Sequence, residues 1–403
     1  MLPLEPRACS SCGKAKRKCS KQLPTCSRCQ IKGLECVYPT PRPSCFVLYG
    51  DDLSDPPTLR DAAPADADIR LPTPTLSALD GLPSTPSGLN LVSCSSPSVC
   101  PTLSDLQEAW FLTRDSWTVQ PLHIVHLSPT TVSAGWRYIN RIRAWLADWT
   151  TGARNPLIHC RLYQTRLPNS IQDAFTALSS YQSRTPSTEE FIYRILESRA
   201  ASLVDGQSQS DTDLSCFEHV SRVQALIIYS TIRLFDSDIR QRYLAEQQLP
   251  TLYSWSNVML SRAAENSHLL LQSSLEDVAP GLTQPVSPMQ QEEVLWRAWI
   301  RSESIRRTWL VAQMVHAVYL AMQGRSVACP GGIMFTTRKG AWDAESAHSW
   351  MKLCAERNVG FMQRSCMYKV MEEYRPDEVD EFGKSIMEMD FGVERMKSWG
   401  EVH

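Results

Sequence analysis

Six of the fourteen cysteines lie close together near the N-terminus, and the second half of this cluster repeats the spacing of the first. They are Cys9, Cys12, Cys19, Cys26, Cys29 and Cys36, so each half has the pattern C-x2-C-x6-C. Thiolates bind zinc, which takes four of them in tetrahedral geometry. Six thiolates complete two such sites if two of them bridge both metals. The sequence therefore predicts two Zn²⁺ ions, which would supply the folding energy of a segment poor in large apolar residues.

Basic side chains are interleaved with these cysteines and set the segment apart from the rest of the chain. Residues 1–43 carry nine basic and two acidic side chains, a formal charge of +7, whereas the whole chain has −2. Two Zn²⁺ and six thiolates contribute −2, which would leave about +5 on the loaded segment. A short basic segment on an acidic chain favours binding to a phosphate backbone. A zinc or copper sensor or store is the alternative, but it does not explain the basic residues.

Residues 7–39 resemble the DNA-binding domain of the fungal zinc binuclear cluster (Zn2Cys6) transcription factors. The shared features are the cysteine spacing, Pro24, Ser27-Arg28 and the run from Lys32 to Tyr38. The resemblance implies a nuclear regulator that binds CGG-like sites in double-stranded DNA at genes transcribed by RNA polymerase II. It also implies ligand roles: Cys9 and Cys26 as the bridges, Cys12 and Cys19 completing one zinc site, Cys29 and Cys36 completing the other.

The segment between the second and third cysteines supplies most of the predicted DNA contacts. Cys12 and Cys19 are seven residues apart, about two helical turns, so a short helix would present both to the metal. On that helix Lys14, Arg17 and Lys18 would lie on the opposite side. Lysine and arginine on such a helix can donate to guanine in the major groove.

The resemblance adds two roles that helix geometry alone does not single out. It assigns base recognition to Lys16, and phosphate contacts to Lys18 and Arg28. Gly13 and Ala15 stand where family members usually have Arg or Lys, which predicts a weaker hold on the DNA backbone. The run 14–18 is also suited to a nuclear localisation signal. The predicted DNA-binding residues are Lys14, Lys16, Arg17, Lys18 and Arg28.

The segment 40–104 is rich in Pro, Ser and Thr and has few aromatic residues, which is typical of a flexible linker. No heptad of apolar residues is visible in it, so a coiled-coil dimer is not predicted, although a homodimer remains open. No stretch is apolar for long enough to span a bilayer, so no membrane partner is expected.

Residues 105–370 are predicted to form an all-α regulatory domain of eight to ten helices. Apolar residues recur at helical spacing from Tyr138 to Trp149, from Ile171 to Leu178, from Val220 to Leu234 and from Val311 to Met322. Ser187 and Glu190 have the spacing of a capping box that would open a further helix. Three stretches resemble the helical regulatory regions of ascomycete pathway regulators: Ile232–Asp236, Arg306–Trp309 and Gly331–Asp343.

The C-terminal segment 371–403 mixes acidic and apolar residues. Between 372 and 394 there are nine acidic and two basic side chains, with Phe382 and Phe391 among them. This composition is typical of an activation segment that binds transcriptional coactivators. A final helix packed on the regulatory domain is the alternative. Pro376 and Gly383 would interrupt a regular helix, and this favours the flexible activation segment.

No residues are predicted to be catalytic. Asp390-Phe391-Gly392 matches a kinase tripeptide, but the other kinase motifs do not accompany it. His316 lies in an apolar helix and is expected to be a core histidine. An enzyme with an accessory zinc module is therefore a weaker hypothesis than a DNA-binding transcription factor. The compact size resembles pathway-specific regulators of fungal specialised-metabolite gene clusters.

Overall fold

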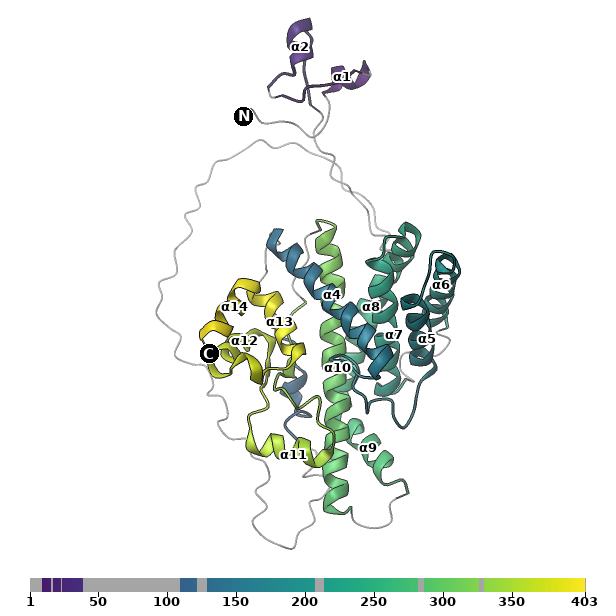
Figure 1. The fold of residues 1–403 in the computed structure, drawn as a ribbon, viewed down its shortest axis with the longest axis vertical. Coiled ribbons are helices and arrows are strands. Elements are labelled where there is room, and N and C mark those ends of the chain that lie inside the picture. The colour runs from purple at the N-terminus through teal and green to yellow at the C-terminus, as the bar shows by residue number, and fades with distance from the viewer. Residues whose placement is uncertain are drawn as a thin grey trace, which may run out of the picture. The chain divides into compact units, whose positions relative to one another are not determined.

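The computed structural model describes residues 9–15, 17–22, 24–38, 109–121, 129–206, 214–281, 286–325 and 330–402. These residues fall into two compact units, an N-terminal module within 9–38 and a helical body from 109 to 402 (Figure 1). The predicted linker 40–104, with Cys45, Cys94 and Cys100 in it, lies outside the described residues, as do Lys16 and Cys329.

The N-terminal module contains two short helices, α1 (Ser10–Lys14) and α2 (Ser27–Lys32). Helix α2 is capped at its C-terminus by Gly33, which has φ = 60° and donates its N–H to the carbonyls of Cys29 and Gln30. Only glycine takes up this left-handed conformation without steric cost, which explains the Gly after Lys32. Helix α1 ends at Lys14, so the prediction of one helix carrying both Cys12 and Cys19 is wrong.

The helical body begins with the 3₁₀ turn η1 (Arg114–Trp117) and continues through long helices. These are α4 (Pro129–Gly152), α5 (Asn169–Gln182), α6 (Glu189–Asp205), α7 (Cys216–Leu234), α8 (Ile239–Glu265), α9 (Ser267–Val278) and α10 (Pro288–Met322). The remaining elements are β1 (Met334–Thr336), α11 (Ala347–Glu356), β2 (Phe361–Gln363), η2 (Arg364–Cys366), α12 (Met367–Glu373), η3 (Pro376–Glu378), α13 (Glu381–Phe391) and α14 (Val393–Val402). The prediction of a mostly helical body is confirmed.

Helix α10 runs the length of the body, and α4, α7, α8 and α9 pack against it, whereas α5 and α6 pack on α7 (Figure 1). It begins at a capping box in which Ser287 Oγ accepts the Gln290 N–H and Gln290 accepts the Ser287 N–H, with Pro288 in the first turn. Helix α7 begins at a second capping box, formed by Ser215 and Glu218. The capping box predicted at Ser187 is wrong, because α6 begins one residue later and Thr188 makes no capping hydrogen bond from its side chain.

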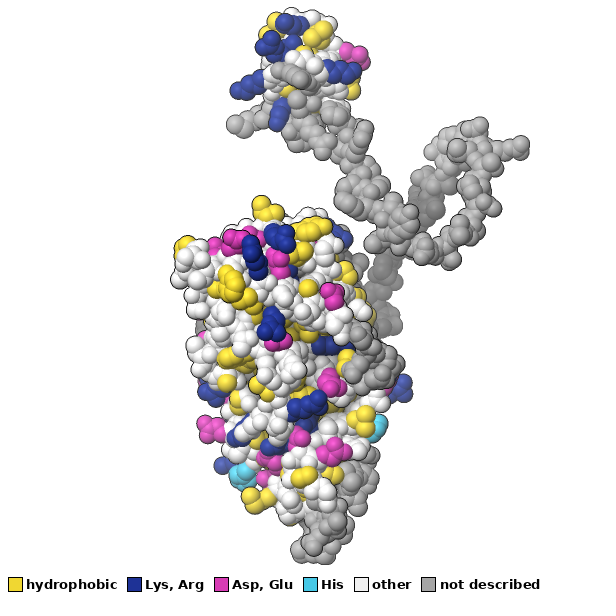
Figure 2. All heavy atoms as spheres, turned by 90° about the vertical axis from the view of Figure 1, so that its right-hand side faces the viewer, with side chains coloured by type: hydrophobic (Ala, Val, Ile, Leu, Met, Phe, Trp, Pro, Cys, Tyr) yellow, Lys and Arg dark blue, Asp and Glu magenta, His cyan; other side chains and the backbone are white. Residues whose placement is uncertain are grey.

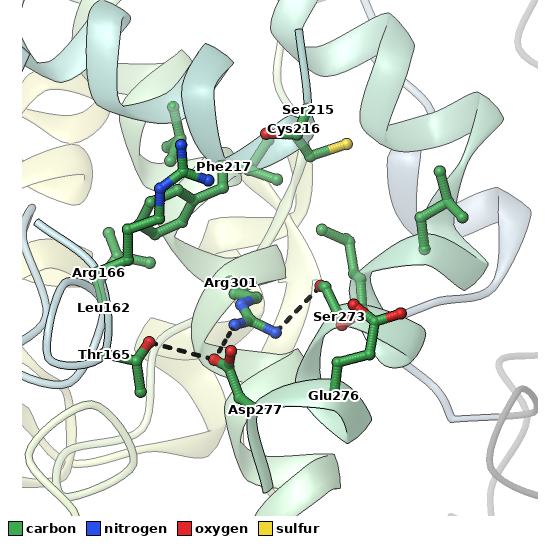
Figure 3. A pocket seen from close by; sticks show the side chains of 14 residues that line it. Leu162, Thr165, Arg166, Ser215, Cys216, Phe217, Ser273, Glu276, Asp277 and Arg301 are labelled. Carbon is green, nitrogen blue, oxygen red and sulfur yellow. Dashed lines mark hydrogen bonds and ion pairs between the residues drawn. The ribbon is translucent and has the colours of Figure 1, made fainter. Parts of the chain in front are cut away.

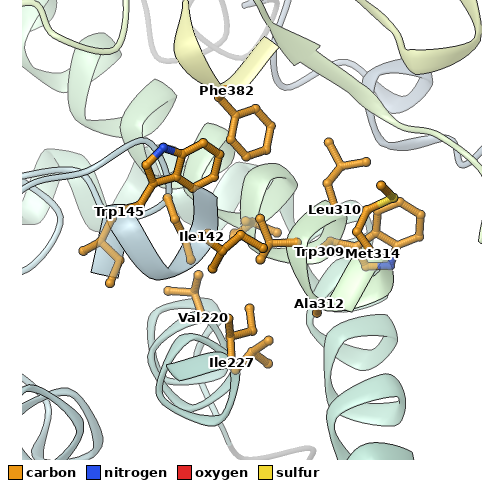
Figure 4. Close-up of a cluster of buried hydrophobic side chains, with 14 of the residues drawn as sticks. Ile142, Trp145, Val220, Ile227, Trp309, Leu310, Ala312, Met314 and Phe382 are labelled. Carbon is orange, nitrogen blue, oxygen red and sulfur yellow. The ribbon is translucent and has the colours of Figure 1, made fainter. Parts of the chain in front are cut away.

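The helical periodicity correctly identified the core-facing sides of α4 and α7. Ile142 and Trp145 of α4 are buried against Val220 and Ile227 of α7 and against residues of α10 (Figure 4). The Trp145 ring stacks on Phe382 of α13 with ring centroids 6.0 Å apart. Aromatic pairs of this kind add to the stability gained from burial.

A buried ionic cluster joins α10 to the C-terminal part of the body. Arg307 donates to Glu303 Oε1 at 3.0 Å and to Asp380 Oδ2 at 2.6 Å, and all three side chains are buried. Its guanidinium also lies over the ring of Trp342 at 4.1 Å. The stretches around Arg307 and Trp342, noted in the sequence for their resemblance to other regulators, therefore meet in the core.

The C-terminal segment is part of this body. Phe382, Ile386 and Met387 of α13 are fully buried. Asp380 accepts the Gly383 N–H and so caps the helix that Gly383 was expected to interrupt. The preference for a flexible activation segment is therefore wrong, and the packed-helix alternative holds. The body extends beyond residue 370 to Val402.

The body also contains a short antiparallel sheet. Strands β1 and β2 form it, with Phe335 opposite Met362. Two residues singled out in the sequence have structural contacts. Asp390 of the kinase-like tripeptide forms an ion pair with Arg364 at 2.6 Å. His316 is half-buried, and its ring lies 5.2 Å from that of Tyr253. In the part of the chain that the structure describes, no helix has the length and hydropathy of a membrane span.

Candidate metal centre and nucleic-acid interface

The structure brings all six N-terminal cysteines together. Their sulfur atoms form two groups of four, and within each group all sulfurs lie within 4.8 Å of one another. One group is Cys9, Cys12, Cys19 and Cys26, and the other is Cys9, Cys26, Cys29 and Cys36. Cys9 and Cys26 belong to both groups. Six sulfurs thus provide eight ligand positions, as two four-coordinate metals require.

The distances between sulfurs fit tetrahedral zinc. Around a tetrahedral zinc with Zn–S bonds of about 2.3 Å, neighbouring sulfurs are separated by about 3.8 Å. The Cys9 and Cys26 sulfurs are 3.8 Å apart, Cys9 and Cys29 are 3.7 Å apart, and Cys12 and Cys26 are 3.7 Å apart. The donor set consists of thiolates alone, which favours zinc over cations that prefer oxygen ligands.

Backbone N–H groups point at several of these sulfurs. The N–H of Cys29 lies 3.4 Å from Cys26 Sγ at the start of α2 and lowers the pKa of the Cys26 thiol to about 6. The N–H of Cys26 lies 3.3 Å from Cys36 Sγ, and that of Lys21 lies 3.4 Å from Cys19 Sγ. Such contacts stabilise thiolate over thiol, the form that a metal needs.

Burial acts in the opposite direction on two ligands. It raises the pKa of the Cys29 thiol to about 12, and it raises the pKa of Cys9 as well. These thiols would hold their protons near neutral pH without a cation beside them. Metal binding must therefore release protons. The positive charge of the metal offsets the cost of burying the negatively charged thiolates.

Hydrogen bonds outside the cluster hold the chain in place around it. The Ser10 N–H donates to the Val37 carbonyl at 2.8 Å, and Ser11 Oγ donates to the Glu35 carbonyl at 2.6 Å. Tyr38 Oη donates to the Gln22 carbonyl at 2.7 Å. Ser27 Oγ donates to Gln22 Oε1 at 2.6 Å. Sequence reasoning missed Ser11 and Gln22, because they belong to no motif and find their partners only in the fold.

The predicted DNA contacts fall into three classes in the structure. Lys14, Arg17 and Lys18 have exposed side chains. Arg28 is partly buried, and its Nη1 donates to Cys12 Sγ at 3.6 Å, so it contacts the cluster itself. Lys16 lies outside the described residues. On the face of the module that Figure 2 shows, Lys and Arg side chains are spread among uncharged ones, with little acidic surface between them.

The exposed basic side chains give the module a positively charged surface. The Arg17 N–H donates to the Cys12 carbonyl at 3.1 Å, so the chain leaves α1 directly beside a metal ligand. The metal cluster therefore fixes the backbone from which Lys14, Arg17 and Lys18 project. A rigid scaffold of this kind lowers the conformational entropy lost when basic side chains bind a phosphate backbone.

Comparison with known proteins agrees with this geometry. Residues 7–45 match the fungal Zn(2)-Cys(6) binuclear cluster domain. The chain is 25% identical over 429 residues to transcription factor gsfR2 of Penicillium aethiopicum, and the match covers 99% of this chain and 95% of that protein. No solved structure matches the chain. The N-terminal module is therefore a domain that binds two Zn²⁺ through six cysteines.

Proposed function

We propose that this chain, a DNA-binding transcription factor with a fungal Zn(2)-Cys(6) domain, binds CGG-like sites and regulates genes transcribed by RNA polymerase II. The main support is the pairing of a six-sulfur centre with exposed basic side chains at Lys14, Arg17 and Lys18. The two shared sulfurs, Cys9 and Cys26, would be the bridging ligands. The protein would act in the nucleus, with run 14–18 as its localisation signal.

The basic residues would divide between base recognition and backbone contact. Lys16 would donate to guanine O6 and N7 in the major groove, whereas Lys18 would contact phosphate. The hydrogen bond from Arg28 to Cys12 would hold the Arg28 side chain in place, and its remaining N–H groups would donate to a phosphate of the DNA. Ala15 beside Lys16 offers no donor, so sequence preference would depend on few contacts.

The helical body would carry the regulatory part of the function. The relative gsfR2 is named a transcription factor and aligns with nearly the whole chain, so its body aligns as well. From the compact size of the chain and the resemblance of three stretches of the body to ascomycete pathway regulators, we infer a pathway-specific regulator of a specialised-metabolite gene cluster. Coactivators would bind the folded surface of the body, because Phe382, Ile386 and Met387 of the acidic C-terminal segment are already buried in it. A homodimer would need contacts other than a coiled coil.

Selection from a random pool of DNA duplexes tests the proposal. The full chain should enrich CGG triplets. Lys16→Ala should abolish the preference for that triplet, with a loss of about 1–3 kcal/mol on the preferred site alone. Lys18→Ala should weaken binding to all sequences and reduce the salt dependence by about one unit of slope. Lys339→Ala, an exposed lysine of the body, is the matched control and should change neither.

Two results would contradict the proposal. Enrichment of no sequence, with binding that depends only on salt, would leave a nonspecific nucleic-acid binder. An unchanged CGG preference in Lys16→Ala would show that another residue recognises the bases.

A further inference from the structure

A cavity in the helical body lies between the start of α7, helix α9, the middle of α10 and the segment just after residue 160. Its volume is about 290 Å³, close to the lower end of the range of about 300–1,000 Å³ that is usual for ligand sites. Two larger hollows in the body, of about 640 and 740 Å³, are lined mainly by charged and polar side chains. The smaller cavity differs from both because six large apolar side chains line it.

The apolar wall comes from four separate parts of the chain. Leu162, Phe217, Val220, Leu270 and Ile305 line it, and all but Phe217 are almost fully buried. Leu269 also lines the cavity, yet 43% of its surface is exposed. An apolar side chain left open at the edge of an apolar cavity gains stability when a ligand covers it.

Polar side chains gather on one side of this cavity around Arg301. Arg301 of α10 donates from Nη1 to Ser273 and Ser274, and from Nη2 to Asp277 (Figure 3). Its side chain is only 14% exposed. A guanidinium has five N–H bonds, and these partners use three of them. The remaining N–H bonds can donate to an acceptor placed in the cavity.

The charges around Arg301 select against a charged ligand. Asp277 accepts from Arg301 and also lies 3.9 Å from Arg297, which pairs with Glu293 at 2.7 Å. Arg166, at the rim beside Phe217 in Figure 3, pairs with Glu218 at 3.2 Å. The nearby Glu276 adds a negative charge. With every guanidinium beside a carboxylate, an anion would gain little and a cation would meet Arg301 directly.

We propose that this cavity binds a small, uncharged, largely apolar molecule with a carbonyl group that accepts a hydrogen bond from Arg301. The apolar part of the molecule would pack against Phe217, Val220 and Leu269. The bound molecule would connect α9 to α7 and α10, and so would stabilise the body. This site is separate from the zinc module and does not depend on the DNA sequence that the module prefers.

Prodan, a naphthalene with a propionyl group and a dimethylamino group, is a suitable probe because it is uncharged, apolar and fluorescent. Titrated into the full chain, it should show saturable binding at one site and should raise the melting temperature of the body. Arg301→Lys keeps the charge beside Asp277 but loses the spare donors, and it should bind Prodan about tenfold more weakly. The DNA preference should be unchanged in this variant, so that failure at the cavity and failure of the proposed function are distinguishable.

Two variants at the mouth of the cavity test its location. Leu269→Asp places a charge on the apolar wall and should weaken Prodan binding at least about tenfold. Met289→Asp is the matched control, since Met289 is 82% exposed and does not line the cavity. Cys216→Phe puts a larger side chain in the wall of the cavity without adding charge and should also weaken Prodan binding.

Three results would overturn the inference. The first is a lack of saturable Prodan binding to a folded full chain. The second is binding that Leu269→Asp and Cys216→Phe leave unchanged while both variants melt like the parent protein. The third is equal or tighter binding, at the same site, of anilinonaphthalene sulfonate, because its negative charge would show that the cavity selects anions.

Discussion

The module and the helical body are held together in opposite ways. In the described residues of the module, the buried cluster consists of four cysteines with two more cysteines and Tyr38 packed against it. The large apolar side chains of the module face solvent instead, with Ile31 84% exposed and Val37 52% exposed. The body buries aromatic and aliphatic side chains from nearly all of its helices in one continuous core.

The two units therefore gain their stability from different sources, and only the module has its surface left for binding DNA. The module has almost no hydrophobic core to lose, so its fold depends on the metal and its surface is left to basic residues. The body is stabilised by burial and places its charged residues Glu303, Arg307 and Asp380 inside. Loss of zinc should therefore abolish DNA binding without unfolding the body, and damage to the core should leave the zinc content intact.

The largest effect should come from a shared sulfur. Cys26→Ser removes a ligand from both groups of four, so both zinc ions should be lost, together with binding energy of about 10–16 kcal/mol per structural site. Cys36→Ser is the matched control, because Cys36 belongs to one group only and should spare one zinc. Elemental analysis gives the zinc content, and circular dichroism should show unchanged helicity in the body. Equal zinc losses in the two variants would argue against shared ligands.

The next effect should appear in the body alone. Phe382→Ala removes a fully buried ring that stacks on Trp145, and it should lower the free energy of unfolding by about 3–5 kcal/mol. Phe191→Ala, where the ring is 69% exposed, should change it by less than about 0.5 kcal/mol. Urea titration followed by tryptophan fluorescence measures both, and the zinc content should remain at two per chain. Equal stability of the two variants would instead support the prediction that residues 371–403 form a flexible activation segment.

The same contrast explains what could be predicted from the sequence. Ligand spacing is local, so the six cysteines and their repeat were sufficient to identify a two-zinc site. Helical periodicity is also local, and it correctly placed Trp145 and Val220 in the core. The sequence predicted a helix that reaches Cys19, whereas α1 ends at Lys14. The backbone around Cys19 is not helical, because its conformation is set by the position of the Cys19 sulfur in the cluster.

The features that were mispredicted depend on partners distant in the chain. The acidic residues between 372 and 394 suggested a solvated segment, yet Asp380 is buried against Arg307, 73 residues away. Ser187 had the right spacing for a capping box, but the helix begins elsewhere. Arg301 meets Ser273, Ser274 and Asp277 only once α9 packs on α10, so no spacing in the sequence indicated the cavity.

One titration tests the central claim that two zinc ions organise the surface that binds DNA. The full chain, loaded with zinc, is titrated with a chelator while its zinc content, its affinity for a CGG-containing duplex and its helicity are followed together. We predict two zinc ions per chain at the start, loss of sequence-specific binding in step with loss of zinc, and constant helicity in the body. One zinc per chain, or specific binding that survives complete removal of zinc, would contradict the account.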